Sequence, residues 1–133
     1  MAERPSNPAI SEAESHVMEL LWRRAPQASD DLAVALQPST GWHENTVRTL
    51  LGRLVRKGAV RAERDGRRYL YSPLLTRDAW QTQESRSLLQ RVFGGRVAPL
   101  LVHFSRHEKL SAKDVAELRK LVEQLEAKEH RHD

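Results

Sequence analysis

Residues 42–60, WHENTVRTLLGRLVRKGAV, form a helical pattern whose two faces carry different chemistry. At 100° per residue, four aliphatic side chains cluster on one face, all within about 60° of Val47. They are Val47, Leu50, Leu51 and Leu54. The opposite face carries Asn45, Arg48, Thr49, Gly52, Arg53 and Arg56. The pattern predicts a helix from about Glu44 to Lys57, ended by Gly58 as a C-terminal cap, with one face in a core and the other available to a partner.

The next segment, AVRAERDGRRYLYSP at residues 59–73, predicts a β-hairpin. Asp65 and Gly66 favour a two-residue type I′ turn, which would pair Arg64 with Arg67. The strand period of two then places one set of side chains on the face toward the helices. This set is Val60, Ala62, Tyr69 and Tyr71, and we expect both tyrosines in the core.

Two shorter helices are expected before residue 42. Ser11 and Glu14 form a capping-box pattern that begins a helix running to about Arg24. Ser29 is expected to cap a second helix, followed by a loop at 37–41. Helices in this order followed by a hairpin are the arrangement of a winged helix-turn-helix, whose second helix enters the major groove of DNA.

The expected fold class is therefore mainly α with a small β-hairpin wing. A loose N-terminal arm at 1–9 precedes the winged-helix domain at 10–75. Residues 76–128 are expected to form three helices, and 129–133 a charged tail.

Aliphatic side chains recur at helical spacing through residues 76–128. Three helices of this length are marginal as a separate fold, so we expect them to associate into a symmetric dimer. Packing against the first module is the alternative. The expected dimerisation residues are Leu88, Leu89, Val97, Leu100, Leu101, Phe104, Val115, Leu118, Leu121, Val122 and Leu125.

The positive charge of the chain is concentrated in its middle. The whole chain has a net charge of +4, whereas residues 42–77 hold nine basic and three acidic residues, a net charge of +6. A localised basic block is typical of a polyanion-binding surface, and a solvated face is the alternative. Arg, Asn and Thr can bind base edges, and arginines on a hairpin suit phosphate contacts. The candidate residues for binding double-stranded DNA are His43, Asn45, Thr46, Arg48, Thr49, Arg53, Arg64, Arg67 and Arg68.

Several other classes of protein lack sequence support. The chain has no cysteine, so disulfides and thiolate metal sites are excluded. No apolar run suits a membrane span or a signal peptide, so we expect a cytoplasmic protein without membrane insertion. No pattern indicates an enzyme, and no cofactor is expected.

One pair of histidines raises the question of a metal site. His103 and His107 have the i, i+4 spacing that can chelate zinc, with Glu108 or Glu129 as further ligands. Nothing in the sequence fixes those further ligands. Surface histidines without a metal are therefore the preferred interpretation.

The sequence resembles the penicillinase-repressor family of winged-helix regulators, the BlaI/MecI type. Three motifs carry the resemblance, which extends over about residues 10–126: SEAESHVMELLW at 11–22, the two-faced helix at 42–60, and GRRYLYSP at 66–73. It implies a homodimeric repressor on palindromic operator DNA, similar to regulators of β-lactam resistance genes. It also implies release by a membrane-bound sensor protease that cuts within the second dimerisation helix, here at the His103–Phe104 bond.

Two positions depart from the pattern of that family. His43 stands where Ser or Thr is usual, so the cap of the following helix is expected to be weaker or different. His103 stands where the best-known members have asparagine before the cleaved bond. The alternatives to this function are a ligand- or metal-responsive winged-helix regulator of another stress or resistance operon, and a general nucleic-acid-binding module.

Overall fold

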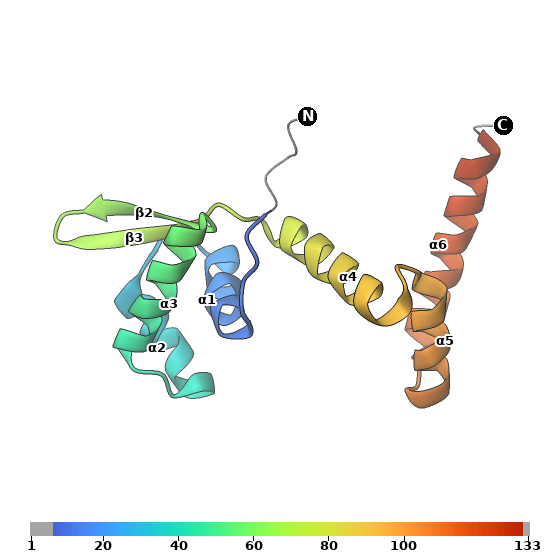
Figure 1. Ribbon diagram of the computed structural model, residues 1–133, viewed down its shortest axis with the longest axis horizontal. Coiled ribbons are helices and arrows are strands. Elements are labelled where there is room, and N and C mark those ends of the chain that lie inside the picture. The colour runs from blue at the N-terminus through green and yellow to red at the C-terminus, as the bar shows by residue number, and fades with distance from the viewer. Residues whose placement is uncertain (1–6, 132–133) are drawn as a thin grey trace. The chain divides into compact units, whose positions relative to one another are not determined.

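The computed structural model describes residues 7–131, and the chain divides into two units, residues 1–85 and 86–133 (Figure 1). The elements in chain order are α1 (Glu12–Arg23), β1 (Gln27–Ala28), α2 (Ser29–Thr40), α3 (Glu44–Lys57), β2 (Val60–Asp65), β3 (Arg68–Pro73), α4 (Arg77–Phe93), α5 (Val97–His107) and α6 (Ala112–Arg131). The expected fold class, mainly α with a small hairpin wing, is confirmed. None of the described helices is long and apolar enough to cross a membrane.

The start of α1 follows the predicted capping box. Ser11 Oγ accepts a hydrogen bond from the Glu14 backbone N–H at 3.1 Å. The Glu14 carboxylate accepts one from the Ser11 backbone N–H at 2.7 Å. Two N–H groups at the start of the helix are thereby satisfied, which fixes where α1 begins.

Glu14 also forms an ion pair with the end of α3. Its side chain is only 1% exposed, and its Oε1 accepts a hydrogen bond from Lys57 Nζ. Its other carboxylate oxygen is buried and has no hydrogen-bond partner in the structure. Burial raises the pKa of the Glu14 carboxyl, but the hydrogen bonds from Lys57 and Ser11 outweigh it and leave the pKa below its ordinary value.

A two-residue strand, β1, was not predicted from the sequence. It pairs antiparallel with β3, with Gln27 opposite Tyr71 and Ala28 opposite Leu70, so the sheet order is β1-β3-β2. Ala28 thus occupies the N-cap position of α2, and Ser29 is the first helical residue. The prediction that Ser29 caps this helix is wrong because strand pairing places the cap one residue earlier.

The end of α2 also differs from expectation. The helix continues to Thr40 through Pro38, where a loop was predicted. The hydroxyl of Thr40 donates to the Leu36 carbonyl at 2.8 Å, and Gly41 ends the helix in the left-handed conformation. The Thr40 hydroxyl and the Gly41 N–H therefore satisfy the Leu36 and Gln37 carbonyls in the last turn of the helix.

The predicted bounds of α3 are confirmed. The helix runs from Glu44 to Lys57, and Gly58 caps it with φ 81° and a backbone N–H shared by the Leu54 and Val55 carbonyls. Its aliphatic face is fully buried. The core of the N-terminal unit consists of Val17, Met18, Leu21, Leu32, Ala33, Leu36, Val47, Leu50, Leu51, Leu54, Ala59, Val60 and Leu75.

The wing is the β2–β3 hairpin, and its register differs from the prediction. Asp65 pairs with Arg68, so the turn consists of Gly66 and Arg67. Gly66 has φ 65°, and the described part of the chain has no residue other than glycine with positive φ. This pattern fits a turn with glycine at its first central position, as in type II′, and not the predicted type I′ turn.

The changed register gives each tyrosine a different partner on β2 but leaves both tyrosines on the predicted face of the sheet. Ala62 lies opposite Tyr71, and Arg64 lies opposite Tyr69. Both tyrosines keep the predicted sheet face, because the displacement is by two residues. Tyr71 packs against the core, but Tyr69 moves toward the tip and is 50% exposed, so its predicted core position is wrong.

The chain leaving the wing is attached to α1. The Trp22 indole N–H donates to the Leu75 carbonyl at 2.8 Å, and the Trp22 and Trp80 rings lie 5.3 Å apart. Arg77 lies over the Trp22 ring and forms an ion pair with Glu19 at 2.8 Å. The first turns of α4 therefore belong to the N-terminal unit.

Candidate nucleic-acid interface

The polar face of α3 is exposed while its other face is buried. The predicted site residues at the N-cap of this helix and within it are all exposed: His43, Asn45, Thr46, Arg48, Thr49 and Arg53. The Thr49 hydroxyl donates to the Asn45 carbonyl at 2.9 Å, one turn earlier in the helix. The helix therefore presents amide, methyl and guanidinium groups together, the set that can contact base edges in a major groove.

The N-terminal end of α3 lacks a side-chain cap. His43 occupies the N-cap position, and its side chain makes no capping hydrogen bond, as its departure from Ser or Thr indicates. Trp42, just before it, packs against the core and meets the His16 ring edge-on at 5.8 Å. The uncapped backbone N–H groups are thus held in place by a packed tryptophan, and they suit a phosphate contact.

A basic depression of about 330 Å³ joins α3 to the wing. We call it the arginine depression; its lining residues are Ser29, Arg48, Arg67, Arg68, Tyr69 and Tyr71. It contains three guanidinium groups and three hydroxyl groups, and these lining residues include no carboxylate. This composition suits a phosphate group, because guanidinium forks and hydroxyls both donate to phosphate oxygens.

Only some of the predicted site residues line the arginine depression. Arg48 from α3 meets Arg67 and Arg68 from the wing. Arg64 is separate, since its Nε donates to the Gly66 carbonyl at 3.1 Å at the hairpin tip. Ser29, Tyr69 and Tyr71 were not predicted as site residues.

The chain is similar in sequence to proteins of known function. The sequence profile described as "Penicillinase repressor" matches residues 10–124, most of the chain. The chain belongs to the penicillinase repressor family. The resemblance seen in its motifs is thereby confirmed, and the family is one of transcriptional repressors, not enzymes.

Individual members of the penicillinase repressor family are moderately similar. The penicillinase repressor of Bacillus licheniformis is 28% identical over 117 residues, covering 88% of this chain and 91% of that protein. The methicillin resistance regulatory protein MecI of Staphylococcus aureus (strain N315) is 27% identical over 113 residues, covering 85% and 92%. The solution structure of the DNA-binding domain of the repressor BlaI has a TM-score of 0.51 and 29% identity, covering 59% of this chain and 93% of that chain.

Gly52 lies in the middle of the polar face of α3 in this penicillinase repressor family member. A Cβ atom at this position would meet only the flexible end of Arg56, at 3.5 Å, an ordinary contact. The protein's own packing therefore does not require glycine here, which excludes a tight helix crossing. The space over Gly52 is wide enough for a partner to approach the helix backbone closely.

We expect Gly52→Ala to have opposite effects on stability and on DNA binding. Removing a mid-helix glycine should raise the free energy of unfolding by about 0.5–1 kcal/mol. The added methyl group should weaken binding to operator DNA if the groove contacts this face. Urea unfolding and fluorescence anisotropy with labelled DNA measure the two effects. A less stable variant, or one that binds DNA as tightly as the parent, would contradict this interpretation.

None of the predicted dimerisation residues is buried within the chain. Leu89, Leu100, Leu101 and Leu118 are half-buried. The others are exposed: Leu88, Val97, Phe104, Val115, Leu121, Val122 and Leu125. The second unit thus presents an unusual number of large apolar side chains to its surroundings.

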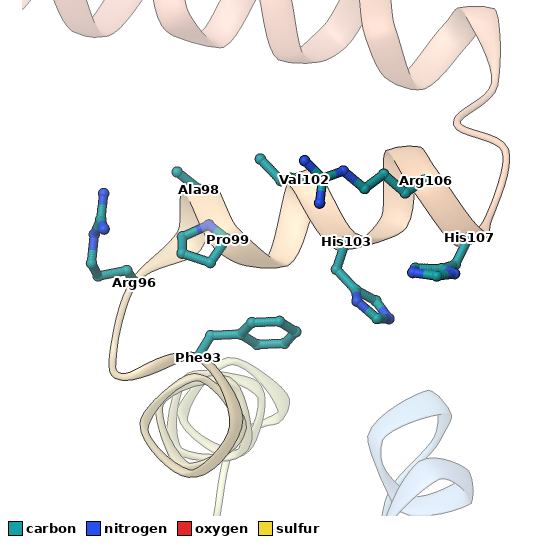
Figure 2. A pocket seen from close by; sticks show the side chains of 8 residues that line it. All are labelled: Phe93, Arg96, Ala98, Pro99, Val102, His103, Arg106 and His107. Atoms are coloured by element: carbon teal, nitrogen blue, oxygen red, sulfur yellow. The ribbon is translucent and has the colours of Figure 1, made fainter.

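The two histidines of α5 line a pocket of about 440 Å³ beside Phe93 (Figure 2). The rings of His103 and His107 have centroids 4.5 Å apart. Among the described residues, no group of three His, Cys, Asp or Glu side chains could hold a metal ion. Glu108 and Glu129 therefore do not complete a site with these histidines. The His103–Phe104 bond lies inside α5, with both residues exposed.

Proposed function

We propose that this chain is a repressor that binds a palindromic operator as a homodimer in the cytoplasm. In this proposal α3 enters the major groove, and Asn45, Arg48 and Thr49 face the base edges. Membership of a repressor family gives the class of function. The observation that supports this docking is the arginine depression of about 330 Å³, where Arg48 of α3 and two wing arginines line one continuous basic surface.

The remaining site residues have supporting roles in this proposal. His43 and Thr46 stand at the first turn of α3, where backbone N–H groups attract a phosphate. Arg53 extends the polar face of α3, and Arg64 contacts the DNA backbone from the hairpin tip. These contacts position the protein, whereas contacts from the centre of α3 select the sequence.

The second unit supports the proposal of a homodimer. Its exposed apolar side chains would be covered by the same surface of a second copy, since a two-fold axis brings identical patches together. Two copies of α3 would then meet two half-sites, which is the arrangement that a palindromic operator requires.

Selection of genomic fragments by the purified protein, at two salt concentrations, tests this function. We expect one palindromic sequence to be enriched at both concentrations, because base contacts depend less on salt than phosphate contacts. Uniform binding that disappears at the higher salt concentration would contradict a sequence-specific repressor and favour a general nucleic-acid-binding module.

Substitution of single residues on α3 should reduce sequence-specific binding. We expect Arg48→Ala or Asn45→Ala to weaken operator binding by about 1–3 kcal/mol and to relax the preference at the contacted base pair. Anisotropy titrations with the operator and with single-base variants of it measure both effects. An Arg48→Ala protein that binds its operator as tightly as the parent would show that this docking is wrong.

A wing substitution should act on all DNA sequences alike. Arg68 lies in the arginine depression, so Arg68→Ala should remove one phosphate contact. We expect the slope of log Kd against log salt concentration to fall by about one unit, with unchanged base preference. Titrations at four salt concentrations measure the slope; an unchanged slope would remove Arg68 from the backbone contacts.

Release by a membrane-bound sensor protease is also part of the proposal, and it rests on the resemblance to the family. A cut between His103 and Phe104 would separate most of α5 from α6 and so divide the proposed dimer surface. Because the bond is helical, α5 must open locally before a protease can cut it. Mass spectrometry of the protein from cells exposed to a β-lactam tests the idea: a fragment ending at His103 is expected, and an intact chain in derepressed cells would contradict it.

A further inference from the structure

Glu44 is an acidic residue in the part of α3 that would lie nearest to DNA. It is the first residue of the helix and the only Asp or Glu between Glu44 and Lys57. Its Oε1 accepts a hydrogen bond from Arg48 Nη2 at 2.7 Å, one helical turn away. Both side chains are exposed to a large extent, so the pair is accessible to a partner.

The stability of the fold accounts for only part of this arrangement, since a carboxylate in the first turn of α3 interacts favourably with the helix dipole. Exposed i, i+4 pairs contribute little to stability, because solvent screens them and both side chains lose rotamer freedom. A carboxylate at this place also repels the phosphates on both sides of a major groove. Glu44 should therefore weaken binding to DNA in general, unless the DNA offers it a donor.

The major groove offers carboxylates few donors. Only the amino groups of cytosine N4 and adenine N6 point into it, and carboxylates commonly accept from cytosine N4. The N-terminal residues of a helix in the groove are those that reach base edges. Arg48, one turn further along, can donate to O6 and N7 of guanine. The Glu44–Arg48 pair thus offers one acceptor and one donor fork at adjacent positions.

We propose that Glu44 is a specificity-determining residue, which accepts a hydrogen bond from a cytosine N4 amino group while its ion pair holds Arg48 within reach of a neighbouring guanine. Half-sites without the amino group leave the carboxylate facing only phosphates and acceptor atoms, and they are bound more weakly. Glu44 therefore selects by repulsion as well as by attraction. This inference rests on the proposed function, in which α3 lies in the major groove.

The test compares Glu44 with a matched acidic residue of the wing. Glu63 on β2 is exposed and forms an ion pair with Arg61 at 3.3 Å. Glu44→Ala and Glu63→Ala each remove one negative charge and one exposed Glu–Arg pair from the same basic segment. The parent and both variants would select binding sites from a pool of random DNA duplexes, with the selected sites read by sequencing. Thermal unfolding by circular dichroism checks that each variant is folded.

We expect Glu44→Ala to lose the preference for one cytosine in each half-site. The ratio of affinities for the parent site and for a site with that base pair changed should fall from about tenfold to near one. Glu63→Ala should select the same sequence as the parent. An identical consensus for Glu44→Ala, or the same loss in Glu63→Ala, would overturn the inference.

A third variant should change the preferred base, which impaired folding alone would not do. Glutamine pairs with adenine N6 and N7, so Glu44→Gln should change the preferred base from cytosine to adenine at that position. A Glu44→Gln protein that still prefers the same cytosine would overturn the role of the carboxylate. A parent protein that selects no motif would overturn the proposed function itself, whereas a parent motif kept by all three variants would overturn only the role of Glu44.

Discussion

Replacing Lys57 by methionine should lower the free energy of unfolding by about 3 kcal/mol. The change leaves the Glu14 carboxylate buried without its charged partner, and loss of one partner of a buried ion pair is strongly destabilising. Loss of one partner of a buried ion pair commonly costs about 3–5 kcal/mol. We expect the lower value here because the Lys57 side chain is 37% exposed, so solvent screens part of the attraction. Urea unfolding at neutral pH measures the change.

Arg56→Met is the matched control for this substitution. Arg56 is the neighbouring residue on α3, it carries the same charge, and it is exposed. Its replacement should change the free energy of unfolding by less than about 0.5 kcal/mol. Equal effects of the two substitutions would show that the Glu14–Lys57 pair has no special role in stability.

The same ion pair predicts how stability depends on pH. The folded-state pKa of Glu14 lies below its ordinary value of 4.5, so the carboxylate contributes stability above that value, and the contribution is lost as the pH falls through the folded-state pKa. In Lys57→Met, burial without the cation should raise this pKa, and protonation then relieves the penalty. The difference in stability between parent and variant should therefore shrink in two steps on acidification: the variant gains stability as the pH falls through its raised Glu14 pKa, and the parent loses stability below pH 4.5.

Replacing Leu125 on α6 by glutamate should convert the proposed dimer into a monomer. Leu125 is 56% exposed in the single chain, so the charge costs the monomer little, but it would be buried at the interface of two copies. A monomer cannot hold two half-sites at once, and operator affinity should fall by about 10²- to 10⁴-fold. Sedimentation velocity measures the assembly, and anisotropy measures the affinity.

Val34→Glu provides the control for assembly. Val34 is also a large apolar side chain, 75% exposed, but it lies on α2 in the first unit. This variant should sediment like the parent. A Leu125→Glu protein that still sediments as a dimer, or a Val34→Glu protein that becomes monomeric, would place the interface elsewhere.

The elements that could be predicted from the sequence are those with strong local signals. The capping box of Ser11 and Glu14 fixes the start of α1, and the glycine cap at Gly58 fixes the end of α3. These signals act within one helical turn, so they need no knowledge of the tertiary structure. The periodic aliphatic face of α3 likewise lies in the core where the pattern placed it.

The parts that depend on contacts between distant residues could not be predicted. β1 has only two residues, too few to show a period, and it exists because it pairs with β3. The hairpin register follows from the turn at Gly66 and Arg67, whereas Asp65–Gly66 is the stronger local signal. Without that register, neither the exposure of Tyr69 nor its place beside Arg48 could be foreseen.

The pairing of β1 with β3 has a mechanical consequence for DNA binding. It ties the wing by backbone hydrogen bonds to the residues that begin α2, in the same unit as α3. In the proposed docking, this pairing limits movement of the wing relative to α3, so a bound duplex would adapt its groove width to the protein. Base steps that bend or narrow at low energetic cost would then be favoured even where no side chain touches them.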